Sequence, residues 1–206
     1  MVLAPHPKVL VYDDLIEHSE KQYYIATLLG GTFFMNSYGE GDDNFPPLSN
    51  YISGKQWLEG YDKSYLKVEN ETMARVKKIT SLFNEIATEA KIKLGEIDNC
   101  TTYALTVADK LQLNCGANKS VLLYMANDAW KDSWGGELQI SEGDTIVCTV
   151  PFIPGRVIHL NGELKCRTIG PCAKSPKFMV FATLVYSKYE STVHDDSSVR
   201  PAKLYL

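Results

Sequence analysis

Residues Leu123–Trp130 read Leu-Tyr-Met-Ala-Asn-Asp-Ala-Trp, and residues Trp134–Leu138, shortly after them, read Trp-Gly-Gly-Glu-Leu. The first half of this stretch is apolar and predicts a buried strand, and the Asn-Asp pair after it predicts a turn. The glycine pair suits a tight turn into a second strand, because glycine adopts backbone angles that other residues avoid. The stretch therefore predicts two consecutive strands, joined by a loop that carries two tryptophans.

Short apolar segments continue on both sides of this stretch, separated by Gly, Pro, Asn and Asp. We expect strands over 101–107, 121–126, 137–140, 145–150, 156–160 and 178–186. Short strands that recur about every ten residues are typical of a sandwich or a barrel of antiparallel sheets.

The N-terminal half has a different pattern. It predicts a strand over 9–12, a helix over 15–29, a strand over 32–35 and a surface loop over 38–47. The strongest helix signal begins near Asn70, and we expect Gly95 to stop that helix. Its apolar residues recur every three or four positions on one stripe, at Met73, Val76, Ile79, Phe83, Ile86 and Ala90. A single apolar stripe predicts a helix that lies across a sheet, in an α+β fold.

Composition narrows the function. The 206 residues suit one domain, and the net charge of −4 argues against nucleic acid or an anionic membrane as a partner. Five cysteines without a close pair indicate a reducing compartment rather than a disulfide framework. We find neither a signal peptide nor an apolar run of about 20 residues. We therefore expect a cytoplasmic protein, or one inside an intracellularly assembled particle, that is not secreted.

Four elements in order resemble the prolyl-4-hydroxylase-like iron and 2-oxoglutarate oxygenases. Leu123–Leu138 resembles the tyrosine strand, the asparagine/tryptophan turn and the Gly-Gly-Glu-Leu strand of that family. Gly155–Leu160 resembles its next core strand, and Lys177–Ala182 its closing strand, in which Lys177 would be the basic residue that pairs with 2-oxoglutarate. The resemblance implies a double-stranded β-helix (jelly-roll, cupin-like) core over about 99–187, with N-terminal supporting helices. We expect one domain over 1–190 and an extended C-terminal arm over 191–206.

The residues that would hold iron in this family are replaced. A non-haem iron site uses two histidines and one carboxylate. Where the resemblance implies a His-x-Asp pair, this chain has Gln112 and Asn114, which are neutral amides. Where it implies the distal histidine, Cys166 or Arg167 stands, and arginine cannot ligate because it stays protonated. We therefore expect no metal and no cofactor.

Other histidines offer a poor substitute. His18-Ser19-Glu20 matches His-x-Glu but falls in the first predicted helix. His159 lies in an apolar strand, which favours a hydrogen-bonded core residue. The segment His194-Asp195-Asp196 reads as a solvated run of charges near the C-terminus.

The leading hypothesis is a pseudoenzyme: a catalytically silent fold that serves as a binding or structural module, in a virus particle such as that of a phage. Its partners would be other proteins or further copies of itself as an oligomer. The alternative is an active Fe(II) and 2-oxoglutarate-dependent dioxygenase, a hydroxylase with an atypical site. A third hypothesis is a sugar- or peptide-binding module whose cleft floor includes Tyr124, Trp130, Trp134 and Lys177. The terminal Leu204-Tyr205-Leu206 predicts an arm that docks onto a surface, unless it is a frayed tail.

Overall fold

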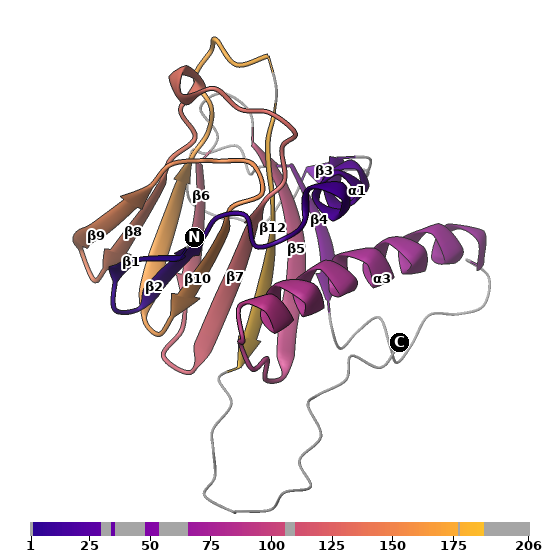
Figure 1. Ribbon diagram of the computed structural model, residues 1–206, viewed down its shortest axis with the longest axis horizontal. Helices are drawn as coiled ribbons and strands as arrows, with labels where there is room; N and C mark the ends of the chain where they lie inside the picture. Colours follow the sequence, from indigo (N-terminus) through magenta and orange to yellow (C-terminus); the bar gives the residue numbers. More distant parts are fainter. Residues whose placement is uncertain are drawn as a thin grey trace, which may run out of the picture.

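The computed structural model describes residues 2–29, 34–35, 48–53, 66–105, 110–176 and 178–187. Two antiparallel sheets face each other, and two helices cover the outer face of the larger sheet (Figure 1). This arrangement is the double-stranded β-helix that the sequence predicts.

The larger sheet has the strand order β1-β2-β10-β7-β12-β5-β4-β3. Its strands are β1 (Val2–His6), β2 (Val9–Tyr12), β3 (Phe34–Met35), β4 (Leu48–Ser53), β5 (Ile97–Leu105), β7 (Lys119–Met125), β10 (Val157–Asn161) and β12 (Met179–Ser187). The smaller sheet has the order β6-β11-β8-β9. Its strands are β6 (Lys110–Cys115), β8 (Leu138–Glu142), β9 (Thr145–Val150) and β11 (Leu164–Ile169).

The helices are α1 (His18–Leu29) and α3 (Leu66–Glu89), and a short 3-10 turn, η2 (Asp132–Trp134), lies in the loop between β7 and β8. As predicted, the apolar stripe of α3 lies against the sheet, since Ile79, Phe83 and Ile86 are buried there. The helix ends before Gly95, however. Lys91 adopts a positive φ of 54°, and its neighbour Ile92 donates a backbone hydrogen bond to Ala87. A lysine therefore takes the left-handed position that closes the helix, although glycine is the usual residue there.

The larger sheet is buried on both faces. On one face, side chains from α1, α3 and the sheet form the helix-side core, which includes Phe83, Leu122, Tyr124 and Ala182. On the other face, side chains from both sheets form the inter-sheet core, which includes Leu123, Met125, Ile140 and Phe181. Successive residues of a strand point to opposite faces, so β7 supplies both cores in alternation. This double burial explains its unbroken apolar sequence.

Four strands were missing from the expectation: β1, β4, β6 and β11. The N-terminal half is therefore more than a helical support, because β1 and β2 pair as a hairpin that joins the larger sheet at β10. An ion pair between Lys8 and Glu142 joins this hairpin to the end of β8 in the smaller sheet. The helix predicted from residue 15 begins at His18.

Several expectations concern residues outside the described ranges, namely the loop over 38–47, the arm over 191–206 and the side chain of Lys177. Among the described helices, none has the length and the apolar character that crossing a membrane requires.

Candidate functional site

Apolar side chains fill the space between the two sheets. Met125, Leu138, Phe152, Met179 and Phe181 meet there, each at most 3% exposed to solvent. They come from both sheets and from the loop before β10, so they occupy the interior from several sides.

The loops before β8 and before β12 meet at one end of the two sheets (Figure 1). Two tryptophans of the first loop contact each other there, and Trp130 packs against the inter-sheet core. The Trp130 indole Nε1 donates a hydrogen bond of 2.7 Å to the carbonyl oxygen of Gly135. Its ring centroid lies 4.8 Å from that of Phe152 and 5.4 Å from that of Trp134. The two tryptophans expected in a cleft floor thus contact each other, and Trp130 packs on the inter-sheet core.

Gly136 shows how closely this end is packed. Its φ is +88°, and a Cβ atom added there would lie 2.7 Å from the Met179 sulfur and 3.2 Å from the Trp130 ring. The second glycine of the Gly-Gly pair therefore permits both a left-handed backbone and a close approach to the core.

Asn127 holds the same end together. Its side-chain nitrogen donates to the carbonyl oxygen of Phe178 at 2.8 Å, and its side-chain oxygen accepts from the backbone N–H of Val180 at 2.9 Å. The Asn127 side chain thus binds the backbone of the closing strand as a neighbouring strand would. A second link joins these loops, since the backbone N–H of Cys172 donates to Trp134 at 2.8 Å.

Tyr124 does not line this space. Its side chain lies in the helix-side core at 0% exposure, on the opposite face of the sheet from Met125. Burial, with a smaller contribution from Glu85 of α3, raises the pKa of its hydroxyl. The expectation that Tyr124 forms a cleft floor beside the tryptophans is wrong, because a single residue along a strand reverses the face.

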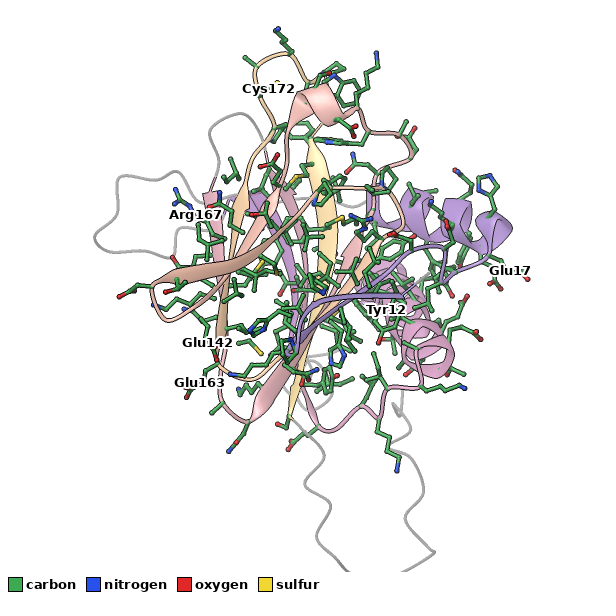
Figure 2. The ribbon with its side chains drawn as sticks, turned by 60° about the vertical axis from the view of Figure 1, so that its left-hand side comes forward. Tyr12, Glu17, Glu142, Glu163, Arg167 and Cys172 are labelled. Carbon is green, nitrogen blue, oxygen red and sulfur yellow. The ribbon has the colours of Figure 1, made fainter. Side chains whose placement is uncertain are left out.

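The residues that stand where the resemblance implies iron ligands lie on opposite faces of the smaller sheet. Gln112 and Asn114 of β6 and Arg167 of β11 are exposed, and Gln112 is the cross-strand partner of Arg167. Figure 2 shows Arg167 on the outside of the sheet. Cys166, by contrast, is fully buried in the inter-sheet core. Burial raises the pKa of its thiol to about 12, so it is protonated at neutral pH.

The described histidines also lie outside the inter-sheet space. His6 lies 3.9 Å from Glu142, and His18 is exposed at the start of α1. His159 is buried beside Tyr186, whose hydroxyl is 2.8 Å from its Nε2, and Tyr186 belongs to the helix-side core. His159 is therefore the hydrogen-bonded core residue that its apolar strand predicts. Within the described ranges, no group of three His, Cys, Asp or Glu side chains is placed to hold a metal.

These donors do not fit the iron site of a non-haem oxygenase. Such a site needs imidazoles and a carboxylate that converge on one open face. Among the described residues, the candidate side chains are amides on the outside, a protonated thiol inside and three histidines in other parts of the molecule.

One charge pair, between the buried Arg156 and the half-buried Asp13, was not predicted from the sequence. Arg156 is 7% exposed and binds Asp13 through two hydrogen bonds, from Nε to Oδ1 at 2.6 Å and from Nη2 to Oδ2 at 2.9 Å. Its Nη1 also donates to the carbonyl oxygen of Pro151 at 3.1 Å. These hydrogen bonds hold the pKa of Asp13 below its usual range. The pair ties the segment after β2 to the loop before β10, and its partners are 143 residues apart.

No protein-family model matches the sequence, and no curated protein matches it. Solved structures do match. A prolyl hydroxylase from Trichoplax adhaerens, in complex with a peptide of the hypoxia inducible factor oxygen degradation domain, aligns with a TM-score of 0.58 at 11% identity. The alignment covers 88% of this chain and 84% of that one.

Two bacterial structures align comparably. A Pseudomonas putida prolyl-4-hydroxylase has a TM-score of 0.52 at 11% identity, with 88% of this chain and 92% of that chain covered. A 2OG-Fe(II) oxygenase family oxidoreductase from Burkholderia pseudomallei has a TM-score of 0.51 at 11% identity, with 87% and 84% covered. These structures confirm the fold that the resemblance implies. The fold by itself does not give any residue a function, because one fold can support many chemistries.

Proposed function

We propose that this chain is a binding or structural module that uses the oxygenase fold without its iron chemistry. The observation that carries the proposal is the filling of the inter-sheet space by apolar side chains, with the described histidines in other parts of the molecule.

The histidine count supports this proposal. The sequence has four histidines, and a facial triad needs two that point into the same space. His6, His18 and His159 lie outside the inter-sheet space, so only His194 is left as a candidate iron ligand. One imidazole cannot supply both nitrogen ligands of such a site.

The packing supports it as well. A ferrous ion with its carboxylate co-substrate is polar and charged, and burying such groups among apolar side chains without partners is costly. Met179, Phe152 and Trp130 close the end of the interior at which the loops meet. Opening that space would expose side chains whose burial stabilises the fold, at about 1.5–3 kcal/mol for each large apolar residue.

The rival function is an active 2-oxoglutarate dioxygenase, and its support is the likeness in fold to prolyl hydroxylases. The two are distinguished by purifying the protein without chelators, measuring bound iron, and reconstituting it anaerobically with Fe(II). We expect iron well below one equivalent, no 2-oxoglutarate binding by calorimetry and no succinate formed. An active prolyl hydroxylase taken through the same steps is the control. Stoichiometric iron together with 2-oxoglutarate turnover would establish the rival.

A place in a larger assembly, such as a virus particle, extends the proposal and rests on the sequence alone. The C-terminal residues end in Leu204-Tyr205-Leu206, an apolar cluster suited to docking on a neighbouring subunit. Truncation after Tyr189 tests this extension by mass measurement in solution and by melting temperature. If the shortened protein keeps the mass of its oligomer and its melting temperature, the arm has no role in assembly.

A further inference from the structure

On the outward face of the smaller sheet, polar side chains from β6, β11 and β8 lie side by side. In β11, Lys165 and Arg167 point outward, alternating with the buried Leu164, Cys166 and Thr168. Each of the two cations is flanked by side chains on the neighbouring strands. Arg167 lies between Gln112 and Gln139, and Lys165 lies between Asn114 and Ser141. We call these six residues the outer polar face.

The outer polar face carries two cations and no carboxylate, in a chain whose net charge is −4. Opposite charges on neighbouring strands stabilise a sheet by about 0.2–1 kcal/mol, so acidic residues would be favoured beside Lys165 and Arg167. Amides and a hydroxyl stand there instead. Among the residues that the structure describes, no salt bridge reaches either cation.

Three exposed acidic side chains border this face: Glu137 lies two residues before Gln139, Glu163 lies two residues before Lys165, and Glu142 follows Ser141. Figure 2 shows Glu142 and Glu163 at the lower end of the same side of the molecule, away from Arg167. Glu142 already pairs with Lys8. Within the described ranges, the charges of Lys165 and Arg167 are therefore not paired in a salt bridge, and both side chains are exposed.

We propose that the outer polar face docks an extended acidic segment of a partner protein, with carboxylates at alternate positions. Lys165 and Arg167 are two residues apart in one strand, which sets their Cα atoms about 7 Å apart. Alternate side chains of an extended peptide laid along β11 have the same spacing. A guanidinium binds a carboxylate with two parallel hydrogen bonds, and the flanking amides supply donors for backbone carbonyls.

One apolar side chain adds to this surface. Ile146 of β9 is the cross-strand partner of Ser141 and is 57% exposed. An apolar residue of the partner segment, next to its carboxylates, would cover the Ile146 side chain. This inference deepens the proposed function by assigning a surface and a partner class, and it does not depend on whether the inter-sheet space binds iron.

The test uses the full chain and a synthetic peptide in which Glu alternates with Thr. We expect saturable binding in calorimetry that weakens as salt is added. The double variant K165E/R167E should lose affinity by about tenfold or more, because it reverses both charges. The control K93E/K174E reverses two exposed lysines outside this face and should bind as the wild type does. Circular dichroism and melting temperature verify that both variants are folded.

Four results would overturn the inference. The first is wild-type binding weaker than about 1 mM, and the second is equal binding of a peptide with Gln in place of Glu. The third is tighter binding of heparin or DNA than of the peptide, which would assign the face to anionic polymers. The fourth is self-association that only K165E/R167E abolishes, which would make a second copy of the chain the occupant. The iron measurement tests the proposed function separately, so the two failures are distinguishable.

Discussion

Tyr124 and Met125 are neighbours in β7, yet their side chains lie in different cores. Tyr124 packs among the helices, and Met125 packs between the two sheets, where its sulfur accepts a hydrogen bond of 3.3 Å from the backbone N–H of Ile153. The sheet between them separates the helix layer from the space between the two sheets. The residue of this pair that faces that space is an apolar methionine.

The buried hydroxyl of Tyr124 has no hydrogen-bond partner among the described residues. An unsatisfied buried polar group costs about 1–3 kcal/mol, so Tyr124→Phe should raise the free energy of unfolding by about 1 kcal/mol. Tyr186→Phe is the matched control, since it removes a hydroxyl that bonds to His159 and should lower stability instead. Urea unfolding followed by circular dichroism measures both. A loss of stability in Tyr124→Phe would show that its hydroxyl has a partner.

Gly136→Ala should destabilise the protein by about 2–4 kcal/mol, because it combines a positive φ with overpacking against Met179 and Trp130. Gly143→Ala is the control. Its φ is also positive, at +59°, but an added Cβ would meet nothing within 4 Å. We expect it to cost only the backbone strain, about 1 kcal/mol. Equal costs for the two variants in urea unfolding would contradict the close packing at the end of the inter-sheet core.

Asp13→Asn should destabilise the protein by about 3 kcal/mol near neutral pH, since it leaves the buried Arg156 without its counter-charge. The folded-state pKa of Asp13 is lowered, so its contribution is present above the ordinary carboxyl pKa of about 3.9. That contribution is lost as the pH falls through the lower, folded-state pKa. The difference in free energy of unfolding between the wild type and Asp13→Asn should therefore become smaller in acid. The exposed neighbour Asp14 provides the control, and Asp14→Asn should unfold with about the same free energy as the wild type at each pH.

Glu20 and Glu85 place two carboxyls together between α1 and α3, and Tyr24 donates to Glu85 at 2.7 Å. Contact with Glu85 raises the pKa of Glu20. A raised folded-state pKa favours folding below the ordinary carboxyl range, and this benefit is lost as the pH rises. Glu20→Gln should therefore melt at a higher temperature than the wild type at pH 7, with little difference in acid. Glu17 lies about one turn earlier, next to the start of α1, and Glu17→Gln is the control. If it raises the melting temperature at pH 7 by the same amount, the effect is not specific to the pair of Glu20 and Glu85.

Local pattern and order along the chain were enough to predict the fold. The stripe of α3 follows from periodicity, and the strand over 9–12 from its β-branched and apolar residues. The ordered set of strand, turn and glycine pair carries the family resemblance that implies the β-helix. These features depend on residues close in sequence. In the segment Leu164–Ile169 the charged Lys165 and Arg167 alternate with Leu164 and Cys166, a pattern from which β11 could have been predicted.

Tertiary structure decided the site. Because both faces of β7 are covered, its sequence does not alternate, and nothing local shows whether Tyr124 or Met125 faces the inter-sheet space. Register also placed Gln112 beside Arg167 on the outside, from strands about fifty residues apart in the chain. Asp13 and Arg156 are farther apart still, at 143 residues, and no pattern in the sequence links them. Such contacts form only when the strands pair. The hydrogen-bond register between strands, and not nearness in the sequence, brings these side chains together.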